Sequence, residues 1–110
     1  MPRPQRCRRV NDMPRIKQFN PETRKNEKKD EIIMTIDEYE TIRIIDYEEK
    51  TQEECAKSME VGRTTVQQIY NNARNKIAKS IVEGRPLFIK GGCYKISNET
   101  GRRHRNCNEI

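Results

Sequence analysis

Five polar residues, all of types that contact nucleic acids, lie at helical spacing in one segment of the sequence: Arg63, Thr64, Gln67, Gln68 and Asn71. An arginine can bind guanine through two acceptors, and a glutamine or asparagine can form two hydrogen bonds with adenine. The spacing places all five on one face of a helix, and none of them is acidic. We therefore expect this face to contact the edges of DNA bases.

Two predicted helices and a turn position this face. Thr51 begins the first helix, because its hydroxyl can accept from the backbone N–H near Glu54 while the Glu54 carboxylate reaches back. This helix covers Gln52–Met59, and a turn over Glu60–Gly62 leads to a longer helix over Arg63–Val82. A stripe of apolar residues marks the buried side of the longer helix: Val66, Ile69, Ala73, Ile77 and Ile81. This layout is that of a helix-turn-helix, whose second helix enters the major groove.

Further residues are expected to contact the DNA backbone. Backbone N–H groups at helix N-termini favour phosphate, and cationic side chains farther along the second helix can flank it. The N-terminal arm is basic, and such arms reach phosphates or an adjacent minor groove; the alternative is a solubilising tail. The residues assigned to the backbone are Thr51, Gln52, Thr65, Arg74, Lys76, Lys79, Arg3, Arg6, Arg8 and Arg9.

Composition and charge limit the class of protein. The chain has 110 residues, of which 32% are hydrophobic and 36% charged, with a net charge of +6. That is enough for one domain with a modest core, and it argues against a large enzyme fold with a deep pocket. Basic residues gather in 1–29 and 62–110, and acidic residues in 30–61, which favours a polyanionic partner. We find no apolar run long enough to span a membrane and no signal peptide, so we expect a cytoplasmic protein.

The sequence predicts a mainly α fold with a three-helix helix-turn-helix core. A first helix is expected to begin near Asp37, which can cap it together with Glu40, and to end around Glu48 to Lys50. Ile16 to Phe19 and Leu87 to Ile89 are expected as short strands that pair with each other. The expected organisation is a basic arm and loop (1–30), the DNA-binding domain (31–83), a short strand and turn (84–94) and a polar C-terminal tail (95–110).

Four segments in this order resemble a known family: MPRP at the start, TIDEYETIRIID, the helix-turn-helix TQEECAKSMEVGRTTVQQI, and EGRPLFIKGGCY. The resemblance covers about residues 1–94 and is to domain-of-unknown-function family 134, described as predicted prokaryotic DNA-binding proteins. It implies a DNA-binding fold without enzymatic activity. The helix-turn-helix is also similar to region 4 of sigma factors.

Two residues of the turn depart from the family pattern, which usually reads M-G-V-S-R there. Glu60 stands in place of the glycine that ends the first helix, so we expect it to carry a positive φ. Gly62 stands in place of the serine that caps the second helix, a loss of a few tenths of a kcal/mol. Neither departure alters the expected fold.

Cysteine and histidine near the C-terminus raise the question of a metal. Cys93, His104 and Cys107 lie within fifteen residues, and Cys7 could join them through space. Four such ligands could hold zinc or an iron–sulfur cluster, and the protein would then be a metal- or redox-responsive regulator. The paired spacing usual for such sites is missing, so we expect no cofactor and interpret Cys55 as a small core residue.

The remaining alternatives concern activity and partners. An enzyme is not expected, because the chain has one histidine and no glycine-rich phosphate loop after a strand. Duplex DNA is the expected partner, with a homodimer reading paired half-sites. Two other classes stay open: a basic protein bound to RNA or the ribosome, and an adaptor that docks on RNA polymerase.

Overall fold

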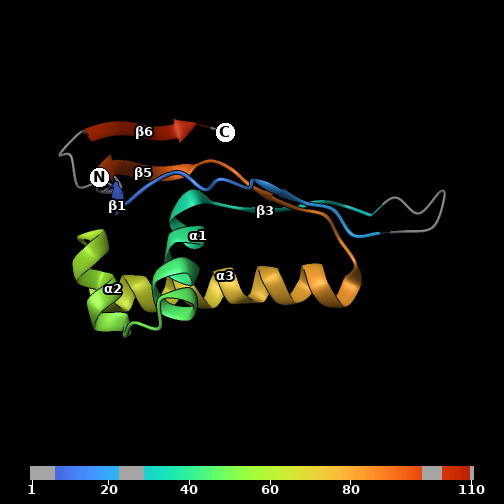
Figure 1. The fold of residues 1–110 in the computed structure, drawn as a ribbon, viewed down its shortest axis with the longest axis horizontal. Coiled ribbons are helices and arrows are strands. Elements are labelled where there is room, and N and C mark those ends of the chain that lie inside the picture. Colours follow the sequence, from blue (N-terminus) through green and yellow to red (C-terminus); the bar gives the residue numbers. More distant parts are fainter. Residues whose placement is uncertain (1–6, 23–28, 98–102, 110) are drawn as a thin grey trace, which may run out of the picture.

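The computed structural model describes residues 7–22, 29–97 and 103–109, with only the backbone for Ser97 and for residues 103–109. Three α-helices form one layer: α1 (Ile36–Ile42), α2 (Gln52–Met59) and α3 (Arg63–Glu83). Short strands form a second layer along one side of them (Figure 1). These strands are β1 (Arg8–Val10), β2 (Gln18–Phe19), β3 (Ile32–Met34), β4 (Leu87–Ile89), β5 (Gly92–Ser97) and β6 (Arg103–Glu109).

The strands make two three-stranded sheets. In the first, β5 lies between β1 and β6, parallel to β1 and antiparallel to β6. In the second, β4 lies between β2 and β3, antiparallel to β2 and parallel to β3. The two sheets follow each other along the strand layer, because β4 and β5 are separated only by Lys90 and Gly91.

The expectation of a mainly α fold is therefore wrong, since the chain has a mixed α/β fold. The expected pairing of the flanks is confirmed: Gln18 is in register with Phe88, and Phe19 with Leu87. The strands β1, β3, β5 and β6 were not expected. A strand of three residues is too short to show a clear alternation of apolar and polar residues. Residues 95–110 are mostly polar, so their composition did not indicate the hairpin of β5 and β6, which pairs with β1 through β5.

The first helix begins two residues before the predicted position. Thr35 caps α1, and its hydroxyl accepts from the backbone N–H of Glu38, whose carboxylate accepts from the backbone N–H of Thr35. Asp37 is therefore in the first turn, where a carboxylate favours the positive end of the helix dipole. After Ile42 the helix continues as one π-helical stretch over Arg43–Tyr47, labelled η1, close to the predicted end.

The two predicted helices after Lys50 and the turn between them are confirmed, and the second of them, α3, ends at Glu83, one residue later than predicted. Thr51 and Glu54 form the capping box of α2, which covers Gln52–Met59 as expected. Glu60 adopts the left-handed conformation, with φ 59°. Gly62 occupies the N-cap of α3 without any side-chain capping bond, as the substitution implies.

Two clusters of buried side chains form the core. One joins the sheets to α1 and α3: Val10, Ile32, Met34, Ile36, Ala73, Leu87, Ile89 and Tyr94. The other lies inside the helix-turn-helix: Ile44, Cys55, Ala56, Met59 and Val66. The predicted stripe of α3 ends early, because Ile81 is 75% exposed. Tyr70, which the stripe did not include, is buried instead.

Candidate nucleic-acid interface

The connection between α2 and α3 is a tight turn held by backbone hydrogen bonds. The N–H of Val61 donates to the carbonyl of Ala56 at 3.1 Å, and the N–H of Glu60 donates to the carbonyl of Lys57 at 3.3 Å. Val61 is half-buried against the cluster that joins the two helices. The left-handed Glu60 reverses the chain, so that α3 starts at Arg63 with its buried side already against α2.

The five predicted base-contacting residues lie on one exposed side of α3. Arg63, Thr64, Gln67, Gln68 and Asn71 are all exposed. The opposite side of the same turns is packed into the protein: Val66, Ile69, Tyr70 and Ala73 are buried. The arrangement leaves the polar side of α3 accessible, while its role in binding DNA stays a prediction.

The predicted phosphate contacts on α3 fall into two groups. Arg74 and Lys79 are exposed, and the Arg74 guanidinium lies 5.3 Å from the centre of the Tyr70 ring. Lys76 is different, because its Nζ lies 2.7 Å from Oε1 of the buried Glu38 and so ties α3 to α1. Thr65, in the first turn of α3, is half-buried. Arg74 and Lys79 are therefore better placed to meet a partner than Lys76.

At the start of α2, Thr51 is exposed and Gln52 is half-buried. The Thr51 hydroxyl already accepts the Glu54 N–H in the capping box. Donation of the proton of this hydroxyl to a phosphate stays a prediction.

The described part of the N-terminal arm lies against the protein. Arg9 donates from Nη1 to the carbonyl of Ser58 in α2 at 3.1 Å, and Arg8 Nε lies 3.9 Å from the Asp37 carboxylate. Arg3 and Arg6 lie outside the described residues. Arg8 and Arg9 thus join β1 to the helices, a role that the run of basic residues did not suggest.

A buried carboxylate that the sequence analysis did not single out fixes the helix preceding α2. Glu40 is fully buried, and it accepts from Arg43 Nε at 2.7 Å, from Arg43 Nη2 at 2.9 Å and from the backbone N–H of Asn11 at 2.9 Å. The hydrogen bond to Glu40 raises the pKa of Arg43 above its ordinary value. The Glu-x-x-Arg spacing was the available signal.

A second missed contact attaches the π-helical stretch to α3. The Tyr70 hydroxyl donates to Asp46 at 2.6 Å. Burial raises the pKa of Tyr70, and the hydrogen bond to Asp46 raises it further. The hydrogen bond to Asp46 and the ion pair of Lys76 with Glu38 thus add two polar contacts to the packing of α3.

A polar hollow of about 490 Å³ borders the exposed side of α3. Its α3 wall includes Gln68, and its other walls come from α1, β1 and β5. Gly92, at φ 94°, is required here, since a Cβ would lie 2.8 Å from Thr35 Cβ and 2.9 Å from Asp37 Oδ1. The hollow is lined by Arg8, Thr35, Asp37, Glu38, Thr65, Gln68, Ile69, Asn72, Gly92 and Cys93.

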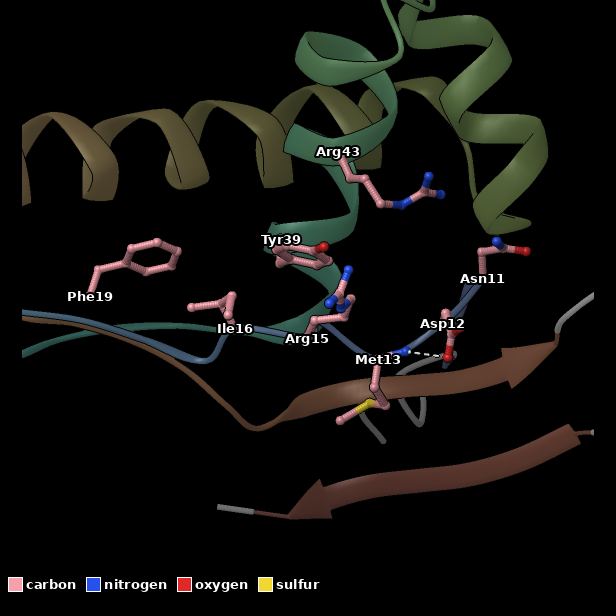
Figure 2. A pocket seen from close by; sticks show the side chains of 8 residues that line it. All are labelled: Asn11, Asp12, Met13, Arg15, Ile16, Phe19, Tyr39 and Arg43. Atoms are coloured by element: carbon pink, nitrogen blue, oxygen red, sulfur yellow. Dashed lines mark hydrogen bonds between the residues drawn. The ribbon is translucent and has the colours of Figure 1, made fainter.

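Another hollow, of about 420 Å³, lies beside α1 at the segment between β1 and β2 (Figure 2). Tyr39 and Arg43 come from the helical side, and Phe19 closes the other end. The single carboxylate in the lining, Asp12, accepts from the backbone N–H of Met13 at 2.9 Å. This lining contains no histidine, cysteine, serine or threonine.

The residues considered for a metal are partly described. Among side chains that the structure describes, no group of three His, Cys, Asp or Glu could hold a metal ion. Cys93 is buried in β5, and its Sγ lies 2.8 Å from that of Cys7. The side chains of His104 and Cys107 lie outside the described residues. Cys55 is fully buried inside the helix-turn-helix core, as expected.

In the described part of the chain, no helix is both long and apolar enough to cross a membrane. Residues 1–97 match the family described as "Protein of unknown function DUF134". This finding confirms the resemblance and extends it slightly beyond residue 94. The exposed polar side of α3 lies within the matched range.

Curated relatives cover most of the chain. A UPF0251 protein of Desulfitobacterium hafniense (strain Y51) is 50% identical over 92% of this chain and 81% of its own length. One of Thermoanaerobacter pseudethanolicus is 42% identical over 96% of this chain and 89% of its own. One of Methanothermobacter thermautotrophicus is 42% identical over 97% of this chain and 53% of its own. No solved structure matches the chain.

Proposed function

The chain belongs to the DUF134 family, and we propose that this family member is a transcriptional regulator that inserts α3 into the major groove of duplex DNA. The observation that carries the proposal is the division of α3 into two sides. Polar, non-acidic residues cover the exposed side, and the core covers the other. Major-groove readers of the helix-turn-helix class present the second helix in this way.

The shape of α3 supports major-groove binding. Directly after the left-handed turn at Glu60, the first residues of α3, Arg63 and Thr64, are exposed. In this class the N-terminal residues of the second helix contact base edges while the first helix crosses the DNA backbone. Within this face, Arg63 can pair with guanine and Gln68 with adenine.

The charges around α3 support the same assignment. The first turn of α3 contains no acidic residue, and Arg74 and Lys79 remain exposed farther along. The charge of one acidic side chain packed against α3, Glu38, is offset by its ion pair with Lys76. Phosphate contacts by exposed cations position a protein on DNA, and base contacts then give the sequence preference.

The test is a fluorescence-anisotropy titration of a random duplex pool at two salt concentrations. Wild type is compared with Arg63→Ala/Gln68→Ala. The matched control is Arg15→Ala/Gln18→Ala, which removes the same two residue types from exposed positions outside the helix-turn-helix. We expect selected duplexes to bind wild type and control equally. The α3 variant should lose about 1–3 kcal/mol of discrimination for each base contact removed.

A different result would overturn the assignment. If wild type and both variants bind all duplexes equally and lose affinity alike as salt rises, α3 does not read bases. Preferential binding of single-stranded or folded RNA would instead favour the RNA-associated alternative, since major-groove reading requires a B-form duplex.

A further inference from the structure

Two hollows adjoin along one flank of α1. The first is the hollow of about 420 Å³ between α1 and the segment that joins β1 to β2. The second, of about 340 Å³, lies between α1, α3 and the second sheet. Phe19 and Tyr39 line both hollows, so we treat the two as one groove with two ends. Pockets that bind small molecules have volumes of about 300–1,000 Å³.

The end of the groove next to α3 is apolar. The hydroxyl of Ser80 at this end already donates to the carbonyl of Arg85 at 2.7 Å. Ile81 is 75% exposed and Phe19 51% exposed, so apolar surface is open to solvent at the mouth of this end. Burial of such surface by an apolar ligand is favourable. Apart from Ser80 and the two shared side chains, the lining is Met34, Ile42, Ile77, Ile81, Leu87 and Ile89.

The other end of the groove contains a cation that is available to a ligand. Figure 2 shows Arg15 pointing from its segment into the space beside α1. Arg15 forms no ion pair with any carboxylate that the structure describes. The two other charged side chains of this end have partners, since Arg43 is paired with two carboxylates and Asp12 accepts from a backbone N–H. Arg15 is therefore the charged group at this end that a ligand can bind.

We propose that this groove binds a small amphipathic monocarboxylate, with its apolar chain against α3 and its carboxylate at Arg15. A guanidinium binds a carboxylate through two parallel N–H···O bonds. One guanidinium balances one negative charge, which favours a carboxylate over a phosphate group of nearly two charges. A wholly apolar ligand would not use Arg15, and a wholly polar ligand would leave the apolar walls exposed.

A ligand in this groove would contact two helices at once. Ile42 belongs to α1, and Ile77 and Ile81 belong to the C-terminal half of α3. The hollow that Gln68 lines is a different one, with walls from β1 and β5. The groove is therefore separate from the polar side of α3, and the inference does not depend on DNA binding.

The test is isothermal titration calorimetry of the full chain with octanoate, decanoate and dodecanoate, each below its micelle concentration. We expect one binding site per chain. The affinity should rise about threefold to fourfold for each added methylene group while the apolar end has room for it. Decylammonium has the same chain length as decanoate and a positive head group, so it should bind about tenfold more weakly beside Arg15.

Two variants test the cationic end. Arg15→Ala should weaken the binding of decanoate by about fivefold, which is the contribution of an exposed ion pair. Lys17→Ala is the matched control, because it removes an exposed cation that lines neither hollow. The control should bind decanoate with the affinity of wild type.

Two further variants test the apolar end. Ile81→Asp places a carboxylate in the apolar lining, so it should weaken the binding of decanoate by about tenfold or more. Val82→Asp adds the same charge at the next position, which is 83% exposed and lines neither hollow. This control should bind as wild type does. Because both side chains are exposed, the two variants should keep the melting temperature of wild type within a few degrees.

The outcomes separate this proposal from its alternatives. Absence of saturable decanoate binding by wild type would overturn it, and so would equal affinities for decanoate and decylammonium. Equal losses in Ile81→Asp and Val82→Asp would place the ligand elsewhere. A dimer of wild type in sedimentation equilibrium that Ile81→Asp dissociates would assign the groove to a second copy of the chain and overturn the proposal. No DNA is present in these measurements, so their failure would leave the proposed function untouched.

Discussion

At the scale of single residues, the buried carboxylate of Glu40 requires partners for both of its oxygens inside the protein. It is fully buried and accepts two hydrogen bonds from Arg43 and one from Asn11. A buried charge of this kind is tolerated because its partner is charged and each oxygen is satisfied. The segment after β1 and the π-helical stretch therefore both depend on it.

We predict that Glu40→Gln destabilises the protein by about 3 kcal/mol, since it breaks a buried ion pair and leaves Arg43 with only its more exposed partner Glu48. The measurement is urea unfolding followed by far-ultraviolet circular dichroism. Glu48→Gln is the control, because Glu48 contacts the same Arg43 from a more exposed position. Equal losses in the two variants would show that burial of Glu40 adds nothing.

Cys55 gives a prediction about pH. Burial raises the pKa of the Cys55 thiol from 9.0 to about 12, and the neighbouring Glu40 contributes in the same direction. In the unfolded chain the thiol ionises at its ordinary pKa. The neutral buried thiol thus contributes stability that is complete below pH 9 and declines as pH rises from 9 toward 12.

We therefore expect the free energy of unfolding to fall more steeply with pH in wild type than in Cys55→Ala. The difference in slope above about pH 9 should approach 1.4 kcal/mol per pH unit. Urea unfolding at several pH values between about 8 and 10 measures it. Cys55→Ala should be less stable at neutral pH, because it removes buried volume. Parallel pH profiles would show that Cys55 ionises in the folded protein.

At the scale of elements, the turn between α2 and α3 combines a strained conformation with an ion pair. Glu60 has φ 59°, a conformation that glycine adopts without penalty. Its carboxylate lies 2.7 Å from Lys95 Nζ and is half-exposed. Exposed ion pairs contribute about 1 kcal/mol or less, so the backbone strain should outweigh the loss of the pair.

We predict that Glu60→Gly stabilises the protein by about 0.5–1 kcal/mol, because glycine relieves the left-handed strain. Glu60→Gln keeps the strain and removes the charge, so it should destabilise the protein slightly. Thermal unfolding of both variants beside wild type decides between the two effects. A lower melting temperature for Glu60→Gly than for Glu60→Gln would mean that the side chain of Glu60 matters more than its backbone.

At the scale of the whole molecule, the core lies between the strand layer and the helices, and the proposed DNA contact lies on the exposed side of α3. The strand layer covers one side of α1 and α3 (Figure 1), and the polar side of α3 stays exposed. The proposed DNA contact therefore requires no rearrangement of the core. Cations outside the network of ion pairs, such as Lys79, remain available for phosphates, whereas Lys76 is bound to Glu38.

This division gives a salt-dependence prediction. Lys79→Ala should weaken binding of all duplexes about equally and reduce the slope of log affinity against log salt by about 1, since one phosphate contact releases about one counterion. Anisotropy titrations over a range of salt concentrations measure the slope. Lys17→Ala removes an exposed lysine outside α3 and should leave the slope unchanged. An unchanged slope for Lys79→Ala would place Lys79 away from the phosphates.

The sequence by itself determined what local interactions control. The capping box of Thr51 and Glu54, the helix α2 and the polar side of α3 all follow from neighbours a few residues apart. The left-handed conformation of Glu60 was expected from the resemblance to the family, which usually has glycine at this position. Capping bonds and the spacing of residues on one helix face involve residues within one or two turns, so the sequence alone predicts them. The family was also evident from the order of the four segments.

Only the tertiary structure decided the features that join distant segments. The strands β3, β5 and β6 exist because partners elsewhere in the chain complete their hydrogen bonds. The same pairing brings Cys7 to Cys93, and packing of α3 on α1 turns Lys76 from a DNA contact into the partner of Glu38. Short strands and long-range ion pairs acquire their stability from contacts far apart in sequence, and these leave no local pattern to read.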